Sequence, residues 1–191
     1  MSARTAIAAA GVLALAAAAT AAGSARYHGR PFPDGAPPGT TGGFGEATCA
    51  LCHLGAELND PAGSLAIEGL PERYTPGQAY RLIVRLRRAD LAAAGFQLSA
   101  RTAAGAQAGT LAGADSATEI RTHAATGVQY AGHTRAGSRP AAPGAGEWVV
   151  TWTAPAPAGP VTFHAAANAA DGDASPLGDY VYSLERASQA P

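Results

Sequence analysis

The only two cysteines of the chain stand three positions apart and are followed directly by a histidine, in Cys49-Ala50-Leu51-Cys52-His53. This C-x-x-C-H spacing is the pattern that attaches a c-type haem. Two thiols so placed can each add to one of the two vinyl groups on a single porphyrin edge. The next imidazole can then ligate the iron. The sequence therefore predicts covalent haem c on Cys49 and Cys52, with His53 as the proximal iron ligand.

Three other uses of these side chains stay open at this point. A thioredoxin-type redox pair needs a βαβ setting, which the surrounding sequence does not show. A structural zinc site needs four nitrogen or sulfur ligands, and Cys49, Cys52 and His53 supply three at most. A Cys49–Cys52 disulfide in an exported protein would leave His53 incidental. Haem attachment is the favoured interpretation.

A haem held by His53 has a second axial position. Methionine is ruled out, because the chain has one methionine, Met1, which is expected to leave with a signal peptide. Histidine remains, and bis-histidine ligation gives a lower reduction potential than Met/His ligation. The candidates are the other histidines of the chain: His28, His123, His133 and His164.

His133 is the predicted distal iron ligand. It ends an expected strand in the sequence Ala-Gly-His-Thr, where the small residue before it leaves room for a flat macrocycle. A solvent-exposed loop histidine is the alternative. His164 in mid-strand and His123 in a Thr/Ala-rich segment are weaker candidates, and His28 is expected to be a bystander. An open sixth position would instead allow small-ligand sensing or weak peroxidase-like chemistry.

The chain has 191 residues, enough for one well-packed domain and an export segment. Its formal net charge is −1, and nothing indicates the clustered basic surface of a nucleic-acid-binding protein. No Ser/His/Asp triad or pair of catalytic carboxylates can be supported from the spacing. The chain is therefore not predicted to be an enzyme.

Three parts follow one another along the chain. Residues 1–25 are predicted to be a helical signal peptide, with Arg4 before an alanine-rich apolar run and Ala-Thr-Ala at 19–21 as the cleavage site. Residues 26–61 are a Gly/Pro-rich segment with the haem motif, and residues 62–187 form the main domain. Cleavage is favoured over retention as an anchor, and no second apolar span follows. We expect an exported protein, periplasmic or extracellular, with no transmembrane anchor beyond the signal peptide.

Glycine and proline dominate residues 26–48, which therefore cannot form a regular helix or strand. The stretch is either a flexible tether or an ordered loop across one face of the haem. Glycine backbone can approach a flat ring closely, because no Cβ intervenes. We expect an ordered loop near the motif and a frayed tail before about Pro31.

From residue 62 onward, apolar residues alternate with polar ones at period two. Trp148, Val150 and Trp152 share one face, for example, and are expected in the core. Short strands with turn signals between them predict an all-β fold, an immunoglobulin-like antiparallel β-sandwich with an N-terminal haem-attachment loop. The expected strands lie near 65–67, 80–87, 95–100, 106–111, 117–122, 127–131, 147–153, 160–167 and 179–184.

Two further groups of charged residues have alternative interpretations. One acidic group could bind calcium through several oxygen ligands, but a polar turn with side chains capping the backbone is favoured; it comprises Asn168, Asp171, Asp173 and Asp179. One basic group could pair with haem propionates or an acidic partner, but a solvated strand face is favoured; it comprises Arg81, Arg85, Arg87 and Arg88.

Short motifs recur in an order that resembles the reelin-like (Reeler) domain in its bacterial form, the choice-of-anchor V domain. The similarity covers about residues 33–184. The resemblance implies an exported reelin-type β-sandwich with a haem-attachment peptide near its start. It also supports His133, which stands in the family's recurrent His-Thr pair. The motifs are Gly35-Ala36-Pro37, Thr41-Gly42, Cys49–His53, Tyr74–Gly77, Gly95–Leu98, Gly109-Thr110, His133-Thr134, Trp152–Pro155, Phe163, Asn168–Gly172 and Gly178-Asp179.

The favoured function is that of an exported monohaem c-type cytochrome-like protein that transfers electrons to an unknown redox partner protein. Reelin-like domains elsewhere are extracellular binding modules without haem, and fold analogy alone cannot decide function. One alternative is therefore a reelin-type binding or structural module in which haem is absent or structural. Another is a haem-based small-ligand sensor.

Overall fold

A computed structural model describes residues 32 and 34–190. The predicted signal peptide, residues 1–25, and the predicted frayed tail lie outside the described residues. Within them, the regular elements are ten β-strands and one short 3₁₀ helix. None of the helical structure in this described part is long and apolar enough to cross a membrane.

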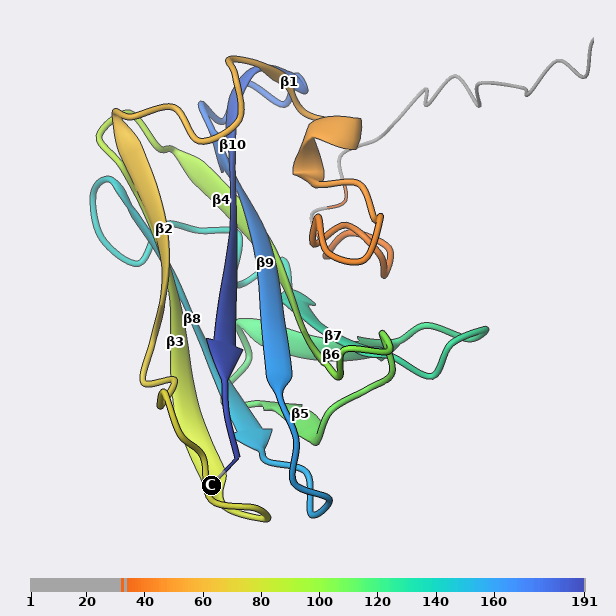
Figure 1. Cartoon of the computed structure of the whole chain (residues 1–191). Helices are drawn as coiled ribbons and strands as arrows, with labels where there is room; N and C mark the ends of the chain where they lie inside the picture. The colour runs from red at the N-terminus through yellow and green to blue at the C-terminus, as the bar shows by residue number, and fades with distance from the viewer. Residues whose placement is uncertain (1–31, 33, 191) are drawn as a thin grey trace, which may run out of the picture.

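The strands form two sheets that pack face to face (Figure 1). The large sheet has the order β1-β10-β9-β4-β7-β6, and the small sheet has the order β2-β3-β8-β5. Neighbouring strands are antiparallel, apart from β1, which runs parallel to β10. The elements are η1 (Cys49–Leu51), β1 (Leu54–Gly55), β2 (Gly63–Glu68), β3 (Ala79–Arg88), β4 (Ala93–Arg101), β5 (Thr110–Gly113), β6 (Thr118–Thr122), β7 (Gln129–His133), β8 (Ala145–Thr153), β9 (Val161–Ala170) and β10 (Leu177–Ser188).

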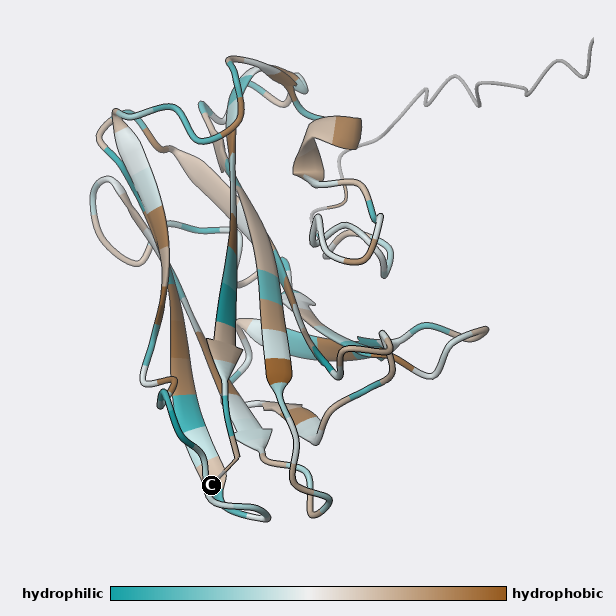
Figure 2. Cartoon of the chain, viewed as in Figure 1, coloured by the Kyte–Doolittle hydropathy of each residue, from teal (hydrophilic) through white to brown (hydrophobic). Residues whose placement is uncertain are grey.

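Alternation along the strands builds the core between the sheets, as Figure 2 shows in the hydrophobic and hydrophilic bands of β9. Trp148, Val150 and Trp152 are buried together on the inner face of β8. The Trp152 ring meets Phe163 of β9 edge to face at 4.8 Å between centroids, and Trp148 stacks on Phe96 of β4 at 4.5 Å. Aromatic pairs at such separations stabilise a core beyond their buried area. The prediction that both tryptophans are core residues is confirmed.

The predicted all-β sandwich is confirmed, and most strands lie where the alternation placed them. Two details differ. The strand expected at 106–111 begins at Thr110, because Gln107 makes an isolated bridge with Arg101 instead of joining β5. Strand β1 was not predicted, since two residues are too short to show a period.

Residues 34–53, which we call the strap, lie against the outer face of the large sheet (Figure 1). The Gln97 side chain of β4 accepts hydrogen bonds from the backbone nitrogens of Gly39 and Thr40 at 2.9 and 2.7 Å. Its amide nitrogen donates to the Pro37 carbonyl at 2.9 Å. These bonds replace regular secondary structure as partners for the strap backbone. Near the motif the segment is therefore an ordered loop, as predicted.

Candidate functional site

The C-x-x-C-H motif occupies one tight turn at the end of the strap. The Thr48 hydroxyl accepts from the Ala50 nitrogen at 3.2 Å and caps η1. The Cys49 carbonyl accepts from the nitrogens of both Cys52 and His53, at 3.1 and 3.0 Å. Figure 1 shows η1 beside the ends of β9 and β10. The turn thus holds the three predicted haem-binding residues close together over the large sheet.

Both thiols of the motif are free and partly buried. Burial raises the pKa of Cys49 to about 12 and also raises the pKa of Cys52. Redox-active C-x-x-C pairs have a lowered thiol pKa, because the thiolate is the reacting species. The surroundings of Cys49 and Cys52 therefore do not favour the thioredoxin-type alternative.

The His53 ring is fixed by two buried residues of the large sheet. Its Nδ1 lies 2.5 Å from Oδ2 of Asp179, and Nδ2 of Asn168 lies 3.0 Å from the same His53 nitrogen. Asn168 also donates to Asp179 Oδ2 at 3.2 Å. Asp179 and Asn168 are 1% and 5% exposed, so this arrangement lies below the surface although His53 itself is partly exposed.

These contacts determine which nitrogen of His53 can bind a metal. A carboxylate only accepts hydrogen bonds, so Nδ1 carries the hydrogen that Asp179 receives. The lone pair of the neutral ring is then on Nε2, which makes no hydrogen bond with the part of the chain that the structure describes. Metal-ligating histidines commonly have this arrangement, with the second ring nitrogen donating to a carboxylate.

Sequence reasoning did not find Asp179 and Asn168 as partners of His53, from which they are 126 and 115 positions away. The sequence did contain a signal for the position of Asp179. Tyr182 points into the core, and strand alternation therefore places Asp179, three positions earlier, on the opposite face of the sheet. Asp171 and Asp173 instead accept from nearby backbone nitrogens, at 3.0 and 2.6 Å, in the turn before β10. For these two residues, the predicted backbone-capping turn is confirmed.

His133 ends β7 and lies against β4. Its Nδ1 is 3.1 Å from the Phe96 nitrogen, and its ring packs on Gly95, where a Cβ would come within 2.6 Å of the ring. Gly95 is the register partner of Asn168, which contacts His53. Burial lowers the pKa of His133 despite the hydrogen bonds of its ring to the backbone of Phe96 and Phe32, which raise it. The structure thus places His133 one strand beyond the partners of His53, and its role as distal ligand stays a prediction.

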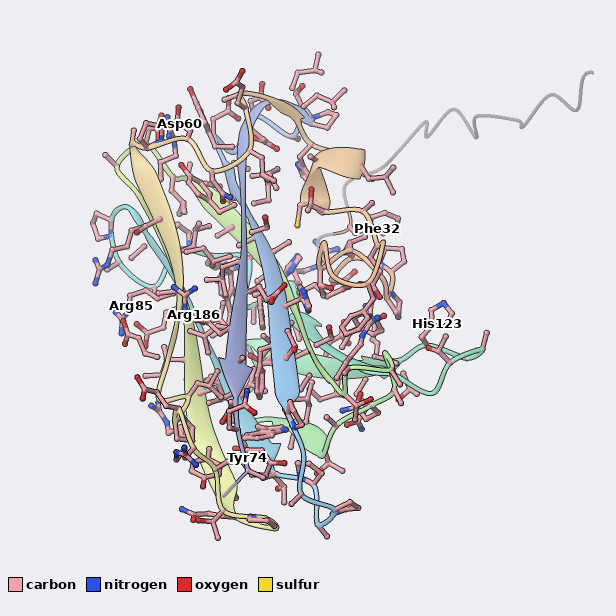
Figure 3. The ribbon with its side chains drawn as sticks, viewed as in Figure 1. Phe32, Asp60, Tyr74, Arg85, His123 and Arg186 are labelled. Atoms are coloured by element: carbon pink, nitrogen blue, oxygen red, sulfur yellow. The ribbon has the colours of Figure 1, made fainter. Side chains whose placement is uncertain are left out.

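The other described histidines differ in position. His164 on β9 lies under the strap, where its ring meets Phe44 edge to face at 5.3 Å and its Nε2 pairs with Glu185 at 3.0 Å. Its Nδ1 is buried without a partner. Figure 3 shows His123 near the tip of the β6–β7 hairpin, away from η1. His28 lies outside the described residues.

Exposed large apolar side chains gather near the motif. Leu51 in η1 and Leu54 in β1 are 67% and 56% exposed, and Leu177, the register partner of Leu54, is 60% exposed. Among the described residues, the remaining exposed large apolar side chains are those of Phe32, Phe44 and Leu58. Exposed leucines beside the motif are available for contact with a ligand or a partner.

The residues present fit a covalently attached porphyrin. The motif supplies two thiols and an imidazole with a free Nε2, and the three leucines supply apolar surface beside them. By contrast, no three or more His, Cys, Asp or Glu side chains within 32 and 34–190 are grouped so that they could hold a metal ion. A structural zinc ion takes four nitrogen or sulfur ligands, and the motif supplies three at most.

No protein-family model and no curated protein matches the chain. Among solved structures, the Reelin-N domain of F-spondin is 24% identical, with 75% of this chain and 95% of that chain covered and a TM-score of 0.46. The reeler domain of human F-spondin is 22% identical over 72% and 95%, with a TM-score of 0.43. A cohesin module from a Clostridium perfringens family 33 glycoside hydrolase is 11% identical over 68% and 96%, with a TM-score of 0.47. These are similarities of fold, and the two-sheet architecture itself rests on the strand pairing described above.

Proposed function

We propose that this chain is an exported β-sandwich module, periplasmic or extracellular, that carries one haem c and exchanges single electrons with a partner protein. Cys49 and Cys52 form the thioether bonds, and Nε2 of His53 is the proximal ligand. The observation that carries the proposal is the hydrogen bond from His53 Nδ1 to buried Asp179, which leaves Nε2 available. When bound, the haem supplies a one-electron iron couple.

The residues around the motif have separate roles in this proposal. Asp179 orients the His53 ring from below, and Asn168 holds the Asp179 carboxylate. Leu51 and Leu54 offer apolar surface that excludes water from the porphyrin edge. His133 is the proposed distal ligand, and its Nδ1 is at present held against the Phe96 backbone of β4. No catalytic step is assigned to any of these side chains.

The first experiment expresses the full chain with the haem-attachment machinery of an exporting host. Purified exported protein should be red and should show a c-type pyridine haemochrome. Mass spectrometry of the peptide spanning Cys49–His53 should show one added haem. The Cys49→Ala/Cys52→Ala variant should lose both signals. Colourless wild-type protein with a Cys49–Cys52 disulfide would contradict the proposal.

A second experiment tests the distal ligand and the sensor alternative. His133→Ala should convert a low-spin haem into a high-spin one, whereas the matched control His123→Ala on the β6–β7 hairpin should leave the spectrum unchanged. Reduced wild-type protein should not bind carbon monoxide if both axial positions are filled. Ready carbon monoxide binding would favour a haem-based small-ligand sensor instead.

A binding or structural module is the second candidate function, and one observation favours it. The buried core between the sheets, from Tyr74 to Tyr182, contains no residue of the strap. The sandwich therefore does not depend on haem for its core. Cys49→Ala/Cys52→Ala protein should fold with nearly unchanged thermal stability, as seen by circular dichroism. If wild-type protein from an attachment-competent host is equally colourless, the binding module is the better assignment.

A further inference from the structure

The carboxylate of Asp179 lies beneath the C-x-x-C-H motif. The Asp179 side chain is fully buried, and its Oδ2 accepts from both His53 and Asn168. Its other oxygen, Oδ1, is buried without a hydrogen-bond partner. The two-residue strand β1 packs against the backbone of Asp179, since Gly55 is its register partner and a Cβ on Gly55 would come within 2.3 Å of the Asp179 carbonyl oxygen. Asp179 thus lies in a paired part of the sheet, with its side chain closed off from solvent.

The burial of Asp179 is informative because its side chain carries a negative charge. Removing a carboxylate from water costs several kcal/mol unless a positive group compensates it. Arginines elsewhere perform that task, as Arg101 does for Glu46. Within the described residues, the one ion-pair partner of Asp179 is His53. The His53 imidazole is therefore the group through which the positive charge of a metal ion on Nε2 would act on this carboxylate.

We infer that Asp179 is a positioning residue that lowers the reduction potential of the iron through His53, and that Asn168 fixes Asp179 in place. This inference rests on the haem of the proposed function. A carboxylate that accepts from Nδ1 increases the basicity of the ligating nitrogen. Its negative charge also stabilises ferric iron more than ferrous iron, because the ferric ion carries one more positive charge. One electron from the redox partner reduces the iron, and no bond or proton on His53 need change.

Asn168 contributes by restricting the carboxylate. Its Nδ2 lies 3.2 Å from Asp179 Oδ2, and its backbone is held between Val181 of β10 and Gly95 of β4. With Nδ1 of His53 protonated, the amide has Asp179 as its acceptor. Loss of this amide would leave Asp179 charged but free to rotate, and the effect on the iron should be weaker than loss of the charge.

Asp179→Asn is the decisive variant, because it removes the charge and nearly preserves the shape. We expect the equilibrium between ferric and ferrous protein to shift toward the ferrous form by about tenfold, since outer partners of this kind change metal affinity or activity by about tenfold or more. Tenfold is about 59 mV for a one-electron couple, read by spectroelectrochemical titration. Asp171→Asn is the matched control, since it removes an exposed charge from the neighbouring turn and keeps the capping oxygen.

The outcomes separate the inference from the proposed function. A haem protein whose potential is the same in the wild type and Asp179→Asn, or equally shifted in Asp171→Asn, overturns the inference alone. A wild-type protein without haem overturns both. If Asp179→Asn does not fold, Asn168→Ala takes its place, and an unchanged potential there overturns the inference.

A spectroscopic measurement tests the positioning without haem. In full-length chain expressed without the attachment machinery, long-range ¹⁵N NMR should show the hydrogen of His53 on Nδ1. Asp179→Asn should raise the share of the Nε2–H form, whereas Asp171→Asn should not. A wild-type ring with its hydrogen on Nε2 would contradict the assigned role of Asp179.

Discussion

The outer faces of the two sheets carry polar side chains in the same alternating pattern, yet only one face is covered. On β4 of the large sheet, Gln97, Ser99 and Arg101 are 2%, 0% and 5% exposed, because the strap lies over them. On β3 of the small sheet, Arg81 and Arg87 are exposed. The comparison shows that alternation determines which way a side chain points, while the covering segment determines whether it meets water.

The covered face holds its charges in specific pairs. Arg101 of β4 forms an ion pair with Glu46 of the strap, and both contact the Tyr130 hydroxyl of β7. Burial raises the pKa of Glu46, but hydrogen bonds from Arg101, Thr41 and Tyr130 outweigh it and hold the pKa below its usual value. This cluster joins the strap to two strands of the large sheet.

The open face uses its charges differently. Arg85 of β3 lies 2.9 Å from Glu68 and 2.8 Å from Glu147, in pairs along the outer surface of the small sheet (Figure 3). Arg88 differs, because its side chain is only 9% exposed and contacts the Tyr182 hydroxyl of the large sheet at 3.1 Å besides pairing with Asp60 and Asp90. The predicted solvated strand face therefore describes the exposed Arg81 and Arg87 but not Arg88. Pairs near the surface, such as those of Arg85, contribute little to stability, because water and salt screen them.

The largest effect is expected from Arg101→Met, which breaks the covered pair. It would leave Glu46 buried without its cation, and such a change costs about 3 to 5 kcal/mol. Urea denaturation followed by tryptophan fluorescence measures the free energy of unfolding. If the free energy of unfolding fell no more than in a variant of an exposed arginine, the strap would not remove the Arg101–Glu46 pair from water.

Gln97→Leu should have the next largest effect. It removes the acceptor of Gly39 and Thr40 and the donor to Pro37, and each buried polar group left without a partner costs about 1 to 3 kcal/mol. Limited proteolysis should then cut the strap while the sandwich stays intact. Gln78→Leu, in the exposed turn before β3, is the control. Cleavage no faster than in this control would contradict the role of Gln97.

Acid should weaken the covered face through Glu46. Its folded-state pKa is lowered, so its contribution is complete above the unfolded pKa of about 4.3. That contribution is lost as pH falls through the lowered folded-state pKa, because protonation favours the unfolded chain. Denaturation at several pH values should show this loss in the wild type and a flatter profile in Glu46→Gln. Parallel profiles would exclude Glu46 as the source.

The smallest effect is expected from Arg85→Met on the open face. Its guanidinium is paired with Glu68 and Glu147 but remains near solvent, so the free energy of unfolding should change little. The same denaturation assay, run beside Arg101→Met at low and high salt, measures the difference between the two faces. Similar losses of unfolding free energy for the two variants would show that the covered and open faces do not differ in the strength of their ion pairs.

Much of the fold could be predicted because alternation is a local property. The inner faces of β3 and β8 follow from the alternation of apolar residues, and Leu82, Val84, Trp148 and Trp152 are all buried. Gln97 lies on the outer face of β4, as its alternation with buried Phe96 and Leu98 requires. Its burial was not predictable, because nothing near it in sequence shows that a segment 57 positions earlier lies above it.

At the candidate site, too, some features follow from the local sequence and others from the tertiary structure. The spacing of two cysteines and a histidine is a chemical pattern within five consecutive residues, so the sequence by itself determined the haem prediction and its three residues. Only the tertiary structure decided that Asp179 and Asn168 lie beneath His53, that its hydrogen is on Nδ1, and that polar residues of β4 are buried. Those features depend on strand pairing and on the path of the strap across the sheet, which bring together groups from distant parts of the chain.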